Sequence, residues 1–233
     1  MIDLTACKNV LTFFAHPDDE TLAAGGTIDK LSNLGAQIHI AIPATGVHSR
    51  RNSLDENGRN LALAELRQDC ENALGILGIS PKRIYFGDFP DNEMDSGSRL
   101  QLIHWLENLL ANIKPDLLIT HHRFCTNIDH QYCHEAAIIA TRPSLNQHTT
   151  LLCAEVPSST GYLKPVQWEP NFFVELNENN LNNKLRAMAT YKDEARLDPH
   201  PRSNEVLTAL AKVRGADSGY YFAEAFMIAK TFA

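Results

Sequence analysis

Ionisable side chains crowd one short segment near the start of the chain. Residues 10–20 read VLTFFAHPDDE, an apolar run that ends at His16 and is followed by three acidic residues. His16 and Asp19 are three residues apart, so in a turn, or in the first turn of a helix, both can face one point. A neutral imidazole and a carboxylate are good ligands for a borderline divalent metal such as zinc. This segment is therefore a candidate metal site.

Asp18 lies between these two residues, and we expect its carboxylate to lie beside the metal without binding it. There it could take a proton from a water molecule that the metal activates. A simpler interpretation is that the acidic residues stabilise the positive end of a following helix. We favour the catalytic interpretation, because charged side chains are seldom buried at the end of an apolar strand without partners.

The apolar residues 10–15 have the composition of a strand that is buried on both faces. Pro17 cannot donate a hydrogen bond to a neighbouring strand, so the strand must end before it. In an open α/β sheet, ligands bind beyond the carboxyl ends of the strands. The acidic segment is expected at such an end.

The segment AHPDDE after an apolar strand resembles the signature of the PIG-L/LmbE-like deacetylase family. Members of this family remove acetyl groups from N-acetylated amino sugars, with a catalytic zinc ion on a Rossmann-like fold. The resemblance implies that His16 and Asp19 bind zinc and that Asp18 is the general base. It also implies a Rossmann-like three-layer α/β/α fold with a mostly parallel sheet, in one domain over residues 1–233.

A second segment, residues 120–143, reads THHRFCTNIDHQYCHEAAIIATRP. The family's second motif ends in Asp-His, so the resemblance implies His130 as the third zinc ligand. It implies Asp129 as a catalytic residue that orients or charges a nearby histidine. Two histidines and one carboxylate leave a position for water, which is the catalytic pattern for zinc, and iron(II) could fit the same ligands.

The chain departs from the family pattern at Asn127 and Cys125, where members often have histidine and aspartate. We expect Asn127 to contact the substrate, and the group that protonates the leaving amine stays open. His130 and His134 are four residues apart on a predicted helix and could form a metal pair of their own. The alternative for His134 is a packing role.

Four further residues are candidates for contact with a substrate or a transferred proton. Arg67 resembles a family arginine that points toward the substrate, although a solvated helix face explains it equally well. Asp91 lies in a turn-rich Phe-Pro-Asp-Asn loop that resembles one bordering the family's site. His200 and Arg202 belong to a Pro-His-Pro-Arg-Ser element found in a subgroup of the family. We expect His200 to be catalytic and Arg202 to bind substrate, the alternative for His200 being an exposed loop.

Apolar patterns and turn residues predict strands and helices that alternate along most of the chain. Alternation of strands and helices means parallel strands joined by crossover helices, in the α/β class. His121 and His122 follow one of the predicted strands and should point to opposite faces, so at most one of them reaches the site. The predicted strands are residues 10–15, 37–44, 83–86, 116–120, 150–156, 172–175 and 220–229. The predicted helices are 21–34, 59–77, 99–113, 179–191 and 204–214, and one further helix is capped by Asn127 or Asp129 and continues to residue 141.

Composition limits the setting in which this chemistry would occur. The 233 residues carry a formal net charge of −7 and no large basic block, which argues against nucleic-acid binding. Five cysteines without CxxC spacing indicate a reducing compartment. No stretch approaches 18 apolar residues and no signal peptide is evident, so we expect a cytoplasmic protein that does not bind membranes. The sequence leaves open whether it forms a homo-oligomer.

The candidate metal site, together with the family resemblance, predicts a zinc-dependent hydrolase; the resemblance implies that it removes the N-acetyl group from an N-acetylglucosamine-type conjugate and releases acetate. One alternative keeps the metal but changes the substrate to another N-acyl amide, such as an N-formyl or mycothiol-like compound. Another is a catalytically silent protein that binds metal or sugar. A silent protein would have no need of Asp18.

Overall fold

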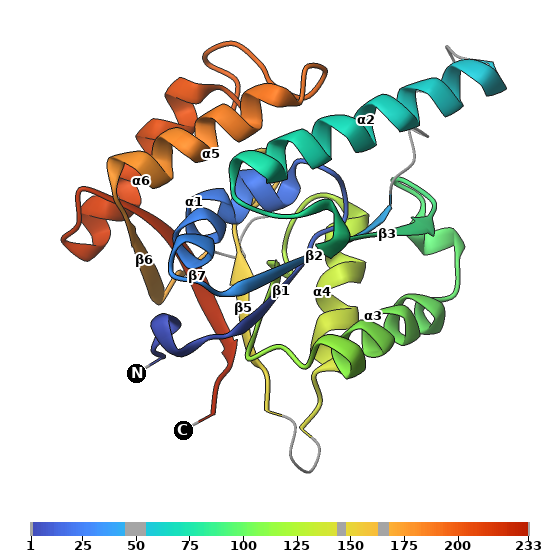
Figure 1. The fold of residues 1–233 in the computed structure, drawn as a ribbon, viewed down its shortest axis with the longest axis horizontal. Helices are drawn as coiled ribbons and strands as arrows, with labels where there is room; N and C mark the ends of the chain where they lie inside the picture. Colours follow the sequence, from blue (N-terminus) through green and yellow to red (C-terminus); the bar gives the residue numbers. More distant parts are fainter. Residues whose placement is uncertain (1, 45–54, 144–147, 163–167, 233) are drawn as a thin grey trace.

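A seven-stranded sheet forms the centre of the computed structural model, which describes residues 2–44, 55–143, 148–162 and 168–232 (Figure 1). The strand order is β3-β2-β1-β4-β5-β7-β6. The first five of these strands are parallel, and β7 runs antiparallel to both β5 and β6. The strands are β1 (Asn9–Phe13), β2 (Gln37–Ala44), β3 (Ile84–Phe89), β4 (Leu117–His121), β5 (Thr150–Ala154), β6 (Phe172–Leu176) and β7 (Phe222–Lys230).

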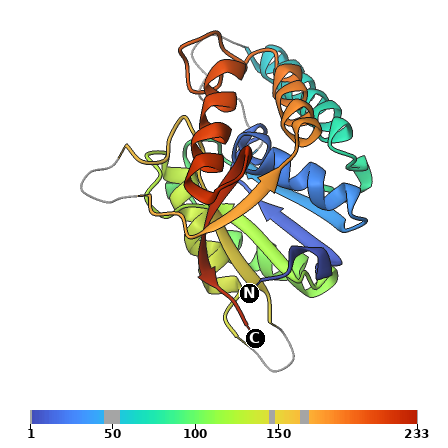
Figure 2. The same cartoon turned by 90° about the vertical axis from the view of Figure 1, so that its left-hand side faces the viewer.

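Helices cover both faces of this sheet, which gives the three layers that the sequence predicts (Figures 1 and 2). Four helices lie on one face: α1 (Asp19–Asn33), α2 (Glu56–Ile76), α5 (Glu178–Thr190) and α6 (Asn204–Ser218). The other face carries α3 (Arg99–Ile113) and α4 (Ile128–Ala140). Short 3-10 helices are η1 (Leu4–Ala6), η3 (Pro81–Arg83) and η4 (Met94–Ser96). Nowhere in the described part of the chain is a helix both long and apolar enough to span a bilayer.

Two hydrophobic cores lie on opposite sides of the sheet, and alternate residues of the same strands contribute side chains to one core or the other. Val10 and Ile40 face the core beneath α1, α2, α5 and α6. Leu11 and Phe13 face the core beneath α3 and α4. All four are fully buried, so the prediction of a first strand buried on both faces is confirmed.

Element boundaries agree with the predictions at β2 and α3 and differ elsewhere for local reasons. Helix α1 begins at Asp19 rather than at residue 21, so the acidic residues do lie in its first turn. Helix α2 begins at Glu56, because the Asp55 side chain caps it by accepting the Gly58 N–H at 2.7 Å. Helix α6 continues past residue 214 to Gly219, whose left-handed φ of 79° ends it. The sequence also predicts that β2 ends at a Thr-Gly pair near the site, residues 45–46, and this pair lies outside the described residues.

Two helical glycines should respond in opposite ways to alanine substitution. A Cβ at Gly215 would lie 2.7 Å from the carbonyl oxygens of Tyr220 and Tyr221, and backbone cannot easily move away. We expect Gly215→Ala to lower the free energy of unfolding by about 1–3 kcal/mol. Gly75→Ala is the matched control, because nothing lies within 4 Å of its added methyl group, and it should raise stability by up to about 1 kcal/mol.

Urea denaturation followed by circular dichroism measures both changes. Equal effects of the two substitutions would contradict the close approach of α6 to the start of β7.

Candidate active site

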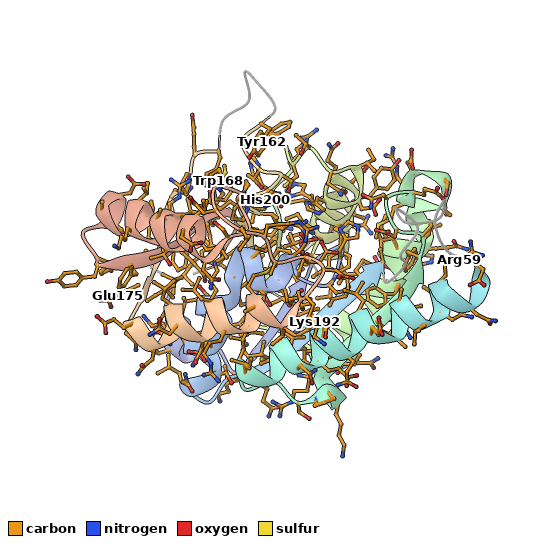
Figure 3. All side chains as sticks on the ribbon, turned by 90° about the horizontal axis from the view of Figure 1, so that it is seen from above. Arg59, Tyr162, Trp168, Glu175, Lys192 and His200 are labelled. Atoms are coloured by element: carbon orange, nitrogen blue, oxygen red, sulfur yellow. The ribbon has the colours of Figure 1, made fainter. Side chains whose placement is uncertain are left out.

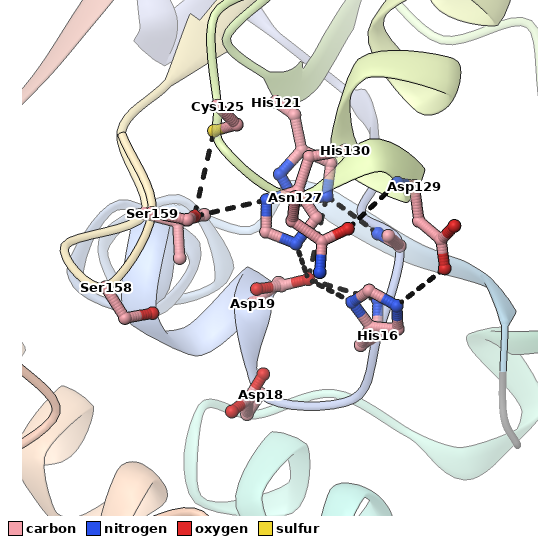
Figure 4. A network of polar contacts seen from close by, with 12 residues as sticks. His16, Asp18, Asp19, His121, Cys125, Asn127, Asp129, His130, Ser158 and Ser159 are labelled. Atoms are coloured by element: carbon pink, nitrogen blue, oxygen red, sulfur yellow. Dashed lines mark hydrogen bonds and ion pairs between the residues drawn. The ribbon is translucent and has the colours of Figure 1, made fainter. Parts of the chain in front are cut away.

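The three residues predicted to bind metal lie together at the carboxyl end of the parallel strands (Figure 4). His16 follows β1, Asp19 begins α1, and His130 lies in the first turn of α4. The Asp19 Oδ2 atom is 3.2 Å from His16 Nδ1 and 3.1 Å from His130 Nε2. The segment between β1 and α1 and the distant helix α4 thus bring two imidazoles to one carboxylate oxygen.

This donor set fits a tetrahedral divalent ion. Bonds of about 2.0–2.1 Å to zinc place neighbouring ligand atoms about 3.3 Å apart, which is close to the distances around Asp19 Oδ2. Two other groups of potential ligands in the described residues share a histidine with this set: His16, Asp91 and Asp129, and His121, Cys125 and His130. In the latter group the two imidazole rings are stacked at 3.8 Å, so their nitrogen lone pairs do not converge on one point.

Asp129 holds His16 from the opposite side of the ring. The His16 Nε2 atom lies 2.9 Å from Asp129 Oδ2, which leaves Nδ1 directed toward Asp19. Asp129 is fully buried and also accepts the backbone N–H groups of Asn92 and Met94 at 2.6 and 3.1 Å. A carboxylate that fixes the outer nitrogen of a histidine is the usual support for a metal ligand.

His130 is fixed by two neighbours that the sequence did not assign to the site. Ser159 Oγ lies 3.3 Å from His130 Nδ1, which leaves Nε2 for Asp19. The His121 ring stacks on the His130 ring, and His121 Nε2 accepts the Ala15 N–H at 2.8 Å. His122 instead contacts Trp168 with its ring. The prediction that at most one of these adjacent histidines reaches the site is therefore confirmed.

His134 has the packing role that was one of its two alternatives. Its Nδ1 atom lies 2.9 Å from the carbonyl oxygen of His121 and 3.6 Å from Cys153 Sγ. In the part of the chain that the structure describes, no potential metal group pairs it with His130.

The charges of the cluster favour a cation. Burial favours a neutral His16, but its hydrogen bonds to Asp129 and Asp19 outweigh burial and raise its pKa to about 10. Burial likewise opposes a charge on Asp19, yet His130 and His16 hold the pKa of Asp19 well below its usual value. With Asp91 Oδ1 3.3 Å from His16 Nε2, three carboxylates surround this one imidazole ring, which favours a positive charge at its position.

Asp18 belongs to none of the potential metal groups in the described residues, and its backbone is unusual. It has φ 109° and ψ −33°, a conformation that residues other than glycine rarely adopt. Its carboxylate faces Arg202, with Nη1 2.8 Å from Oδ2, and the same nitrogen lies 2.5 Å from Glu194 Oε2. Burial raises the pKa of Asp18 well above its ordinary value, and the Arg202 guanidinium offsets this only in part.

A cavity of about 750 Å³ opens beside these side chains. Its wall is mostly polar and contains seven of the predicted site residues: His16, Asp18, Asp91, Asn127, His130, His200 and Arg202. Asp19 and Asp129 lie behind this wall and are buried.

Two residues on the cavity wall have local contacts of their own. His200 is exposed (Figure 3) and accepts the Arg202 backbone N–H at 3.1 Å. Asn127 caps α4 by accepting the Asp129 N–H, and its amide nitrogen donates to Asn92 Oδ1.

Arg67 is not brought to this cavity. Its guanidinium carbon lies 5.2 Å above the Phe86 ring, whereas the preceding residue, Leu66, lines the cavity. The rotation of α2 directs residue 66, and not residue 67, toward this cavity, so the substrate-binding role of Arg67 stays a prediction.

Sequence reasoning missed Ser159 and Glu194. Ser159 could have been found, because it closely follows β5, and the carboxyl end of a parallel strand meets the others at one edge. Glu194 follows α5 in a polar loop and carries no comparable signal.

Comparisons with known proteins agree with the fold and the motifs. The family model described as PIG-L, GlcNAc-PI de-N-acetylase, matches residues 11–141, more than half of the chain. The diacetylchitobiose deacetylase of Thermococcus kodakarensis is 25% identical over 93% of this chain and 81% of its own length.

Two solved structures share the fold. The N,N'-diacetylchitobiose deacetylase of Pyrococcus horikoshii has a TM-score of 0.77 at 21% identity, covering 97% of this chain and 85% of that one. The 4-carboxy-2-hydroxymuconate hydratase of Pseudomonas putida KT2440 has a TM-score of 0.74 at 19% identity, covering 97% and 98%. Fold alone is thus shared with an enzyme named for another reaction. The match of the family model over both motif segments shows that the chain belongs to the PIG-L family.

Proposed function

We propose that this protein is a metal-dependent hydrolase that removes the N-acetyl group from an amino sugar of the N-acetylglucosamine type. The reaction consumes one water molecule and releases acetate and the free amine. One observation carries the proposal: the two histidines of a His-Asp-His donor set and a separate buried carboxylate, Asp18, border the same cavity. The family and the relative from Thermococcus kodakarensis, both named for deacetylation, support it.

His16, Asp19 and His130 would hold the metal, and zinc or iron(II) suits two imidazoles and one carboxylate. When bound, such an ion would act as a Lewis acid and lower the pKa of water toward ~7. Asp129 would keep His16 in the orientation that the ion requires, since it already fixes the outer nitrogen of that ring.

Asp18 is proposed as the general base that takes a proton from the attacking water. Its carboxylate borders the same cavity as His16 and His130, so it could take a proton from a water molecule bound there and later return it. Arg202 would steady this carboxylate rather than bind sugar, since its guanidinium is already occupied by Asp18 and Glu194. Protonated Asp18 or His200 would then give a proton to the leaving amine.

The cavity would hold the sugar and part of whatever is attached to it. Its volume of about 750 Å³ lies within the range of small-molecule sites. Asp91 and Asn127 on its wall would accept hydrogen bonds from, or donate them to, sugar hydroxyl groups.

We further propose that residues 1–233 act as one domain in the cytoplasm, on a small-molecule substrate and not on nucleic acid. One sheet contains strands from residue 9 to residue 230, which supports a single unit. All five cysteines are free thiols, which suits a reducing compartment.

The first test is acetate release from N-acetylglucosamine and its conjugates. Protein treated with a chelator should release none, and added zinc or iron(II) should restore turnover, because the nucleophile depends on the metal. N-formyl and other N-acyl analogues run in parallel identify a different amide substrate. Acetate released equally fast without metal would contradict the proposal, and metal binding without turnover of any amide would favour a binding protein.

Asp18→Asn should lower kcat by about 10²–10⁴-fold, because the amide cannot accept the proton from water. The variant should still bind one metal ion per chain, since Asp18 belongs to none of the potential metal groups in the described residues. Asp88→Asn, which changes an exposed carboxylate on β3, is the control. Full activity of the Asp18 variant would remove its assignment as base.

Asp129→Asn should weaken metal binding by about 10–100-fold. Asp116→Asn is a matched control, because Asp116 also accepts two backbone N–H groups, from Lys8 and Asn9, but lies near the start of β4. Competition with a chromophoric chelator measures both affinities. An equal loss of affinity in the two variants would show that the effect is not specific to the histidine that Asp129 holds.

A further inference from the structure

Asp18 is held from its backbone by a buried carboxylate. The Asp18 N–H donates to Glu20 Oε2 at 3.2 Å, and Glu20 is fully buried in the first turn of α1. A residue at φ 109° lies in a costly region of backbone space and persists only when its surroundings hold it there. Glu20 is one such restraint.

Glu20 is in turn held by a side chain from another helix. The Tyr191 hydroxyl donates to Glu20 Oε1 at 2.7 Å, and the Thr21 hydroxyl donates to the same oxygen at 2.8 Å. Tyr191 is the C-cap of α5, is fully buried, and does not line the cavity. Helix α5 packs on α1 and α2 (Figure 1), so the hydroxyl fixes Glu20 from a rigid element.

The backbone of Tyr191 leads to the other side of Asp18. Its carbonyl oxygen accepts the N–H groups of Glu194 and Ala195 at 3.0 and 2.8 Å, which shapes the turn that presents Glu194. The Glu194 carboxylate binds Arg202 Nη1, and the same nitrogen contacts Asp18 Oδ2 at 2.8 Å. Contacts therefore run in a closed ring through Asp18, Glu20, Tyr191, Glu194 and Arg202.

We propose that Tyr191 is a positioning residue for Asp18. It acts on the backbone of Asp18 through its hydroxyl group and Glu20, and on the carboxylate through the turn that carries Glu194. The role depends on the proposed function, in which Asp18 is the general base. Tyr191 touches neither the donor set nor the cavity, so it should affect the rate of the chemical step and not substrate or metal binding.

Removal of one hydroxyl group tests this role. Tyr191→Phe keeps the ring in the core but breaks the contact with Glu20, and kcat should fall about tenfold, as is typical for a residue that orients a catalytic group. KM should stay within about twofold of its original value, and metal affinity should not change. Tyr85→Phe is the matched control, because it removes a hydroxyl that bonds His39 between β2 and β3, and its kcat should be unchanged.

The second arm repeats Tyr191→Phe in the Asp18→Asn protein. If Tyr191 acts only through Asp18, the additional substitution should cause no further loss of kcat. A further tenfold loss in that background, or an unchanged kcat in the single variant, would overturn the proposal. General loosening of the fold would lower the residual activity as well, so this comparison separates positioning from stability.

Two further measurements keep the test decisive if the variant does not fold or if the protein shows no activity. If Tyr191→Phe does not fold, Glu194→Gln breaks the same ring at its partly exposed side. We expect Glu194→Gln to lower kcat about tenfold in the original protein and to cause no further loss in the Asp18→Asn protein. If the unaltered protein hydrolyses no amide, the proposed function fails. A crystal structure of Tyr191→Phe then tests positioning alone: Asp18 should leave its positive φ, and an unchanged Asp18 would contradict the role of Tyr191.

Discussion

One carboxylate oxygen, Oδ2 of Asp19, is the atom on which the site depends. It lies 3.1–3.2 Å from the imidazoles of His16 and His130 and 3.7 Å from that of His121. A buried carboxylate with few polar partners would be costly, and these histidines supply the partners. The parallel arrangement of β1 and β4 brings them within reach, since both strands end at the same edge of the sheet. The buried strands and the polar site are therefore two parts of one arrangement.

Much of this arrangement could be predicted, because it follows from local patterns. The run of apolar residues before His16 indicates a strand buried on both faces, and proline and acidic residues mark its end. Alternating strands and helices place the carboxyl ends of β1 and β4 at the same edge of the sheet without any knowledge of their contacts. The resemblance of the AHPDDE and Asp-His segments to a known family then singled out His130 among several neighbouring histidines.

The remaining features depend on contacts that no local pattern encodes. Arg202 was expected to bind substrate, yet it pairs with Asp18, which only the packing of the segment after α5 could determine. Arg67 and Leu66 are adjacent, and a small rotation of α2 decides which of them faces the cavity. Ser159 came to the site through the parallel pairing of β4 and β5, which is a rule of topology and not of composition.

The same fold occurs in proteins named as deacetylases and in one named as a hydratase, so the sheet fixes the place of the chemistry and not its kind. What favours hydrolysis here is the division of labour between two adjacent aspartates. Asp19 starts a helix and turns inward to the histidines, whereas the positive φ of Asp18 turns its carboxylate toward the cavity. A protein that only bound metal would gain nothing from an unfavourable backbone conformation and a buried ring of contacts that maintains it. Strain of this kind is found where a side chain must be presented to a reaction, and in this chain it falls on the proposed base.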